Sequence, residues 1–366
     1  MHLCVNRLSA LALLRWMRST GEPLEYEPCG IPLPDPWPQR RWSTRIVPYQ
    51  QLGRSERPSA QRPIDVAVPD AGSRSRARFF RMTVYGDGLP AGSFARVSSE
   101  FTIPCPELLF LELAAVMDPA ALELVGYELC GTFSRDPANP RTGGVVHGLS
   151  SLTSVQKIKD YLAKCSGIRG LTAARRAIER VRDDAWSAME AIVALLLVRP
   201  QEEGGYGIGE LILNERENAP HELKQQGVTE SRVPDIGLIN LPTGFNYDGY
   251  GHLDLSSIPV ESQNAGEIKA RLAEVREKYV DDLRRNRELL ASGRIVMPIV
   301  AEDLMERGGL DTVVLEAVLA AERLTGRRSE EGARVRHALD KRLSAKRQQL
   351  IWSLYPWTGG QSLGDY

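Results

Sequence analysis

The segment from residue 232 to residue 255 (RVPDIGLINLPTGFNYDGYGHLDL) constrains the fold of this chain more than any other. It contains two short strand-like runs joined by Pro-Thr-Gly, a composition typical of a turn between paired strands. Asp235 lies on the first run, and Asn246 and Asp248 lie on the second. Because side chains alternate along a strand, Asn246 and Asp248 project to one face. The sequence therefore predicts a hairpin that brings both residues opposite Asp235.

These oxygen-bearing side chains suggest two interpretations. Oxygen ligands that converge from neighbouring strands suit a hard cation such as Mg²⁺ or Mn²⁺. Such a cation can activate water against a phosphodiester. The same residues also fit a surface hairpin whose Asp and Asn only stabilise turns, and the hairpin alone leaves both interpretations open.

The composition is that of an ordinary globular protein, with 42% hydrophobic and 25% charged residues among 366. A formal net charge of -1 means that any contact with DNA must come from a local patch. Five cysteines without a CxxC spacing argue against a zinc site and a disulfide framework. No signal peptide and no run of 18 apolar residues is found, so we expect a cytoplasmic protein with no membrane partner.

The first half of the chain predicts an α+β region over residues 1–182. A short helix is expected over residues 8–18 with Ser9 as its cap, and the seven prolines between Pro23 and Pro48 exclude regular helix there. Alternating runs between residues 64 and 101 predict a small sheet, and helices follow it.

The second half predicts an α/β unit over residues 183–325. An apolar helix containing Glu190 is followed by three strands, a long helix that ends at Gly293, a buried-type strand and a final helix. Residues 326–366 form a basic tail, with eight Lys or Arg and three acidic residues between Arg327 and Arg347. This tail fits either a surface that holds nucleic acid or a plain solvated helix.

With these elements in place, the chain resembles a family of actinobacterial proteins that join an AbiEi-antitoxin-like region to a domain related to very-short-patch-repair (Vsr) endonucleases. Four motifs carry the resemblance in the family's order. They are Ser-x-x-Glu at Ser187 to Glu190, a strand with Asp235, the segment NYDGYGH (246–252), and Asp-x-x-Arg-x-x-x-Leu-x-x-x-Gly from Asp282 to Gly293. The segment TIPCPELLFLELA resembles the family's upstream part more loosely.

The resemblance implies a restriction-endonuclease-like mixed sheet flanked by helices and a metal-dependent DNA endonuclease. Asp235, Asp248 and Glu190 would bind Mg²⁺ or Mn²⁺, and His252 would act as a general base or hold a phosphate oxygen. The chain departs from the family at Asn246, where the family has Glu, and the loss of one charge weakens the hold on a divalent ion. Glu190 could instead cap its helix or pair with an Arg, and His252 could be a turn residue.

Three arginines on the long helix are candidates for DNA contacts. Arg284 and Arg287 share one face, which could meet phosphates, although they could equally be solvated partners of Asp281 and Asp282. Arg285 could brace the hairpin through Asp282 or a site carboxylate. The function expected is a divergent endonuclease in phage or plasmid defence. The alternatives are a non-catalytic type IV antitoxin or transcriptional regulator that binds DNA or a toxin partner, and a structural adaptor.

Overall fold

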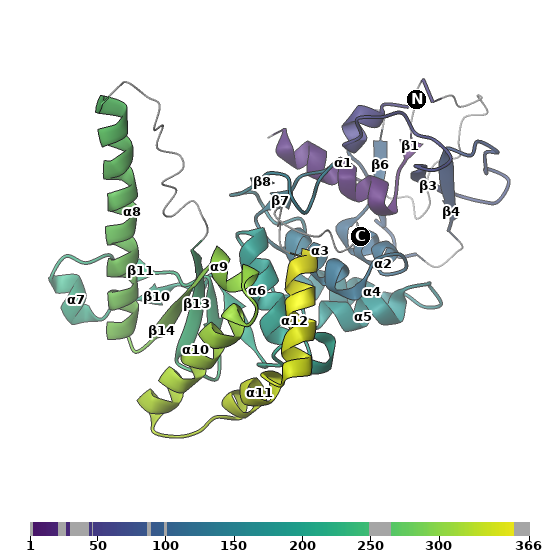
Figure 1. Ribbon diagram of the computed structural model, residues 1–366. Coiled ribbons are helices and arrows are strands. Elements are labelled where there is room, and N and C mark those ends of the chain that lie inside the picture. The colour runs from purple at the N-terminus through teal and green to yellow at the C-terminus, as the bar shows by residue number, and fades with distance from the viewer. Residues whose placement is uncertain are drawn as a thin grey trace. The chain divides into compact units, whose positions relative to one another are not determined.

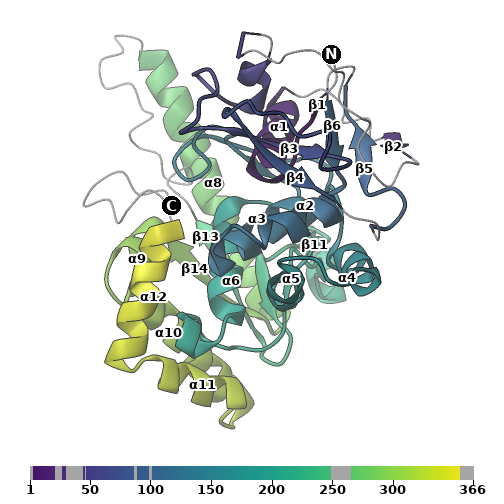
Figure 2. The same cartoon turned by 90° about the vertical axis from the view of Figure 1, so that its right-hand side faces the viewer.

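The computed structural model describes residues 3–20, 27–29, 44–45, 47–85, 89–98, 101–248 and 265–354. The chain divides into two compact units, Met1–Ala188 and Met189–Tyr366, close to the border predicted at residue 183. Both units combine helices with small sheets, so the predicted mixture of helix and strand is confirmed (Figures 1 and 2). Each unit is described below by itself.

The first unit is built from short strands and the helices that pack on them. One sheet has the order β1-β6-β5-β2, in which β1 runs parallel to β6 and the other pairs are antiparallel. Two further pairs, β3 with β4 and β7 with β8, are separate. The elements are β1 (Leu3–Cys4), α1 (Arg7–Ser19), β2 (Glu27–Cys29), η1 (Tyr49–Leu52), β3 (Ile64–Val68), β4 (Phe80–Val84), β5 (Phe94–Arg96), β6 (Phe101–Pro104), α2 (Pro106–Leu113), α3 (Pro119–Cys130), β7 (Ser134–Arg135), β8 (Val145–Val146), α4 (Val155–Lys164) and α5 (Leu171–Ile178).

Helix α3 begins at the dipeptide Asp118-Pro119. The Asp118 side chain caps this helix by accepting a hydrogen bond from the backbone N–H of Ala120, and Pro119 occupies the first helical position, which needs no N–H. The expectation for Ser9 was wrong, because α1 begins at Arg7 and Asn6 takes the capping position. The buried Ser9 hydroxyl instead accepts a hydrogen bond from the backbone of Asp65.

The core of the first unit also holds a buried ion cluster. Glu128 on α3 accepts hydrogen bonds from the guanidinium groups of Arg15 and Arg135, at 2.7 and 2.8 Å for the closest atoms. Burial alone would raise the pKa of Glu128, but the two guanidinium groups outweigh it and hold the pKa well below its usual value. This cluster ties α1 and β7 to α3.

The second unit contains a mixed sheet of order β14-β13-β12-β9. The strands β9, β12 and β13 form an antiparallel meander, and β14 is parallel to β13. The elements are α6 (Ala188–Val198), η2 (Gln201–Glu203), β9 (Leu211–Leu213), β10 (Glu217–Asn218), α7 (His221–Gln225), β11 (Ser231–Arg232), β12 (Ile236–Leu238), β13 (Thr243–Asp248), α8 (Ala265–Ala291), β14 (Ile295–Val300), α9 (Ala301–Met305), α10 (Gly309–Thr325), α11 (Glu330–Ala338) and α12 (Lys341–Leu354).

The predicted order of helix, three strands, helix, strand and helix is confirmed, with β10, α7 and β11 inserted between the first two strands. A parallel pair needs a long crossover connection, and α8 lies within the connection from β13 to β14. Gly293 follows α8 with a φ of +82°, a conformation that glycine adopts without strain. Helices α8 and α10 pack on β14 (Figure 1).

The basic segment after residue 326 is helical over most of its described length, as one of the two alternatives predicted. Up to residue 354 it forms α11 and α12, and α12 packs against α9. Arg347, which counts toward the basic cluster in the sequence, is only 1% exposed. Neither alternative predicts this burial, because a single buried cation in a polar helix leaves no mark on the charge pattern. Within the described part of the chain, no helix combines the length and apolar character needed to cross a bilayer.

Candidate functional site

A row of polar residues crosses the sheet of the second unit at one end of its meander. The register pairs Leu213 with Ile236 and Ile236 with Phe245, so the next residues along, Asn214, Asp235 and Asn246, are neighbours across three strands. The preceding row is apolar and buried. The sheet thus changes from core to polar site within one residue, and the predicted approach of Asn246 to Asp235 is confirmed.

Asp235 is joined to Asn246 and to Tyr247 on β13 by two hydrogen bonds. The backbone N–H of Asp235 donates to Oδ1 of Asn246 at 2.9 Å. In return, the backbone N–H of Tyr247 donates to Oδ2 of Asp235 at 2.7 Å. Side chains therefore take the place of backbone partners where the β12–β13 ladder ends, and we call this pair of bonds the hairpin clasp.

Glu190 reaches the same row from the first turn of α6. Its carboxylate is 7% exposed, and Oε2 accepts a hydrogen bond from Nδ2 of Asn214 at 3.0 Å. The negative charge is favoured in the first turn of a helix, where the helix dipole is positive. Asn214 itself has a φ of +51°, which Asn tolerates better than most residues, and its backbone N–H donates to the Asp235 carbonyl at 3.1 Å.

Asp235 lies close to two other carboxylates, those of Glu190 and Asp248. Burial and, next, the charge of Glu190 raise the pKa of Asp235 to about 7, and Asp248 adds to the rise. The hydrogen bond from Tyr247 and the charge of Arg285 oppose it. Asp235 therefore holds a proton far more readily than an exposed Asp does, and an added cation would lower its pKa by offsetting the charge of Glu190.

Asp248 is held by a cation from the long helix. Arg285 on α8 donates through one terminal nitrogen to Oδ1 of Asp248 at 3.3 Å and lies 3.2 Å from Oδ1 of Asp282. The alternative in which Arg285 braces the hairpin is thus the one the structure shows. Asp282 and Arg285 of the sequence motif form an ion pair because residues three apart on a helix are neighbours.

Arg284 and Arg287 do not join this cluster. Both side chains are exposed on α8, and among the described residues neither has an ion-pair partner. Asp281, suggested from the sequence as a partner of these arginines, pairs with Arg232 at 3.1 Å, and Arg232 also pairs with Glu288 at 2.7 Å. The two arginines therefore remain available for a ligand outside the protein.

Two further predictions for the site concern His252 and the metal ion, and both stay predictions. His252 lies outside the described residues, so its role stays a prediction. Among the residues that the structure does describe, no group of three or more His, Cys, Asp or Glu side chains is arranged to hold a metal ion. Glu190, Asp235 and Asp248 thus share one electrostatic neighbourhood without forming a closed three-carboxylate cage.

Asn246 is oriented by the hairpin clasp. Its side chain is 1% exposed and Oδ1 accepts from Asp235, which leaves Nδ2 as a buried donor without a partner in the described part of the chain. Oδ1 is occupied by the N–H of Asp235, so the unpartnered atom of this amide is the Nδ2 donor. A donor of this kind repels a cation and attracts an anion or a neutral acceptor. Asn246 therefore positions Asp235 through an oxygen that is already engaged by an N–H donor.

Asn214 is the site residue that the sequence reasoning missed. The only signal was an Asn directly after the apolar run LIL, in a strand whose pairing with the hairpin was not yet known. Its importance depends on the register that aligns three strands, and a single sequence does not specify a register.

Comparisons of the chain with protein-family models, with curated proteins and with solved structures find no match. The resemblance to AbiEi-like and Vsr-like proteins therefore stays a prediction carried by the four motifs.

Proposed function

We propose that the second unit is a divergent metal-dependent nuclease that hydrolyses phosphodiester bonds in DNA. The observation that supports this most is the carboxylate pair of Glu190 and Asp235, which repel each other where a polar row ends the central strands. Perturbed carboxylates of this kind gather at functional sites more often than elsewhere. A protein that needed these groups only for turns would gain nothing from their burial.

The residues present fit a magnesium or manganese ion. Mg²⁺ in nucleic-acid enzymes is commonly held by one or two carboxylates, with water and substrate phosphate completing its shell. Glu190 and Asp235 would supply the two carboxylates, and the absence of a three-carboxylate group among the described residues does not conflict with this number. When bound, the ion would stabilise negative charge that develops on the phosphate.

The side chains of the chain have distinct parts in this proposal. Asn246 and the Tyr247 backbone hold the Asp235 carboxylate in place through the hairpin clasp. Asp235 would be ionised once the cation is bound, and His252 is the proposed proton acceptor. The exposed Arg284 and Arg287 would meet backbone phosphates, which fixes the strand without reading its sequence.

A plasmid assay tests the proposal. We expect the full chain to nick supercoiled DNA with Mg²⁺ or Mn²⁺ and not with EDTA. Asn246→Asp keeps the acceptor for the Asp235 N–H, removes the unpartnered Nδ2 donor and adds a charge, so we expect it to nick about tenfold faster at limiting Mg²⁺. Failure of both proteins to nick single-stranded, double-stranded and mismatched DNA would reject hydrolysis.

One observation favours a second function, a non-catalytic antitoxin or regulator. Arg285 already supplies a fixed positive charge to Asp248 and Asp282. Among the described residues, the unpartnered atom of the Asn246 amide is Nδ2, a donor that repels a cation. In that case the site is a rigid scaffold, and the exposed arginines of α8 bind DNA or a protein partner without hydrolysis.

The two functions differ in the metal requirement of binding. A regulator should retain affinity for its own promoter, or for a toxin encoded beside it, in EDTA, and Arg284→Ala with Arg287→Ala should weaken DNA binding and lower its salt dependence by about two counterions. Gel shifts with promoter DNA and co-purification with the neighbouring gene product measure both. Binding that appears only with Mg²⁺ would instead favour the nuclease.

A further inference from the structure

The first unit contains a cavity of about 310 Å³ that the proposed nuclease does not use. It is lined by Arg7 at the start of α1, by Thr83 and Tyr85 at the end of β4, by Glu112 on α2 and by Arg169 before α5. A volume of roughly 300 Å³ lies at the small end of the range for sites of small organic molecules.

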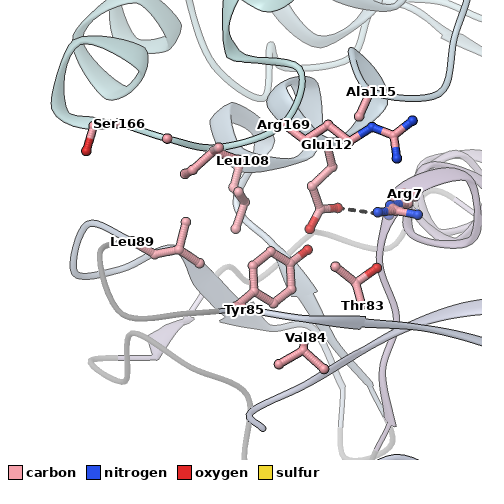
Figure 3. A pocket seen from close by; sticks show the side chains of 12 residues that line it. Arg7, Thr83, Val84, Tyr85, Leu89, Leu108, Glu112, Ala115, Ser166 and Arg169 are labelled. Atoms are coloured by element: carbon pink, nitrogen blue, oxygen red, sulfur yellow. Dashed lines mark hydrogen bonds between the residues drawn. The ribbon is translucent and has the colours of Figure 1, made fainter. Parts of the chain in front are cut away.

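The cavity is apolar on one side and cationic on the other. Figure 3 shows Leu89 and Leu108 toward one side of Glu112, with Arg7 and Arg169 toward the other. Among the described residues, neither guanidinium forms an ion pair with a carboxylate; Arg7 is half-buried and Arg169 is exposed. Two guanidinium groups without an ion pair, next to an apolar wall, suit an anion with an apolar body.

Hydrogen-bond donors near the two arginines also lack partners. In the described part of the chain, Nε of Arg7 and the hydroxyl of Thr83 are both buried and make no hydrogen bond. Buried polar groups are almost always satisfied, so each such atom needs an explanation, and a bound ligand provides one. Both atoms belong to residues that line the same cavity.

The backbone of Arg7 is also strained, which places its side chain at the cavity. Arg7 has a φ of +46°, a conformation that long side chains rarely adopt. Its N–H donates to Oε2 of Glu112 at 2.9 Å, and the neighbouring Asn6 donates to Oε1 of Glu112 at 3.4 Å and to the hydroxyl of Tyr85 at 2.9 Å. These bonds hold the left-handed turn in place.

Glu112 does not cancel the positive charge of the site near neutral pH. Burial raises the pKa of Glu112 to about 8, and Asp65 adds to the rise. The hydrogen bond from the Arg7 backbone, the charge of Arg7 and the hydrogen bond from Asn6 oppose it. Asp65 is itself paired with Arg81 at 2.5 Å, so it contributes little free charge to the cavity.

We propose that this cavity binds a small organic anion, a carboxylate or phosphate monoester with an apolar body, whose charged group lies between Arg7 and Arg169. The Thr83 hydroxyl and Nε of Arg7 would donate to the anion. Leu89, Leu108 and the ring of Tyr85 would contact its apolar part. The first unit is then a ligand-binding module, independent of what the second unit does.

Calorimetry on the full chain with three probes tests the proposal. We expect benzoate and phenyl phosphate to bind with a Kd of roughly 1 mM or tighter, and the neutral benzamide to bind at least about tenfold more weakly. A preference for benzoate assigns a carboxylate, and a preference for phenyl phosphate assigns a phosphate ester. The proposal would be overturned if benzamide bound as tightly as the anions, or if neither anion bound at a ligand concentration of about twenty times the expected Kd.

Matched variants locate the site. Arg169→Ala should weaken the preferred anion by about tenfold, whereas Arg176→Ala, which removes an exposed arginine from α5 that does not line the cavity, should leave its affinity unchanged. Above pH 8 ionised Glu112 repels the anion, so wild-type affinity should fall between pH 7 and 9, and Glu112→Gln should remove that fall. Equal affinities of the two arginine variants would place the anion elsewhere and reject this cavity.

Discussion

Replacing Asp235 by Asn should abolish metal-dependent nicking and at the same time stabilise the second unit above pH 7. Asparagine has no charge for the ion, so we expect nicking to fall by at least about a hundredfold. The amide oxygen can still accept from the Tyr247 N–H, and the backbone bond to Asn246 is unaffected, so the hairpin clasp survives. Loss of activity would then not reflect unfolding.

The stability gain follows from the sign of the pKa shift. In the folded chain the pKa of Asp235 is raised from 3.8 to about 7, so the folded state binds this proton more tightly than the unfolded state does. The stability that this provides is complete below about pH 4 and is lost as the pH rises to 7. The Asp235→Asn variant would not pass through this transition, and at pH 8 it should be more stable than the wild type by about 1 to 2 kcal/mol, allowing for partial exposure.

Thermal melts from pH 4 to 8 and the plasmid assay measure the two effects on one preparation. The control is Glu215→Gln, which neutralises an exposed acid one residue after Asn214 and should change neither activity nor the pH profile. Undiminished nicking by Asp235→Asn would remove Asp235 from the hydrolytic site. A pH profile identical to that of the wild type would show that its carboxylate is not perturbed.

The largest effect on stability alone should come from Arg347→Ala. The buried guanidinium donates to Oδ1 of Asp311 at 2.7 Å and to the carbonyls of Gly205 and Ala338 at 3.0 and 2.7 Å, and it lies 4.0 Å above the ring of Tyr206. Its removal leaves the partly buried Asp311 carboxylate without its cation, although hydrogen bonds from Tyr206 and Ser344 remain, and leaves two carbonyls without this donor, so we expect a loss of about 3 to 5 kcal/mol. For a unit of this size, that lowers the melting temperature by roughly 6 to 20 °C.

Arg342→Ala is the matched control, since Arg342 is exposed on the same helix and should change stability by less than about 0.5 kcal/mol. Acid should weaken the same cluster. Burial alone would raise the pKa of Asp311, but hydrogen bonds from Arg347, Ser344 and Tyr206 hold it below its usual value, so this contribution is lost as the pH falls through that lowered pKa. Equal melting temperatures for the two arginine variants would show that the cluster does not stabilise α12.

The elements of the second unit could be predicted from the sequence because each depends on local pattern. The apolar run around Glu190, the Pro-Thr-Gly turn and Gly293 each specify a helix, a hairpin or a helix end within a few residues. The approach of Asn246 to Asp235 follows from the same local hairpin. These features needed no knowledge of the rest of the chain.

What could not be predicted depends on contacts between distant segments. Asn214 joins the site only through the register of β9 with β12, and Arg347 is buried only because α12 folds back onto the residues around Tyr206. Likewise, the cavity at Glu112 needs Arg7 and Arg169, which are far apart in sequence. Charge pattern along the chain records neither burial nor partners, so both arginine environments stay hidden until the fold is known.

The two hydrogen bonds of the hairpin clasp do not require that residues 235 and 246 carry a charge. Its two bonds use one oxygen of residue 235 and one oxygen of residue 246, and an amide offers that oxygen as well as a carboxylate does. Asn246 is already the uncharged version at one of the two positions. Under the proposed function, a descendant could therefore exchange hydrolysis for simple recognition, or recover it, through single-nucleotide steps between Asp and Asn codons while inheriting the same scaffold.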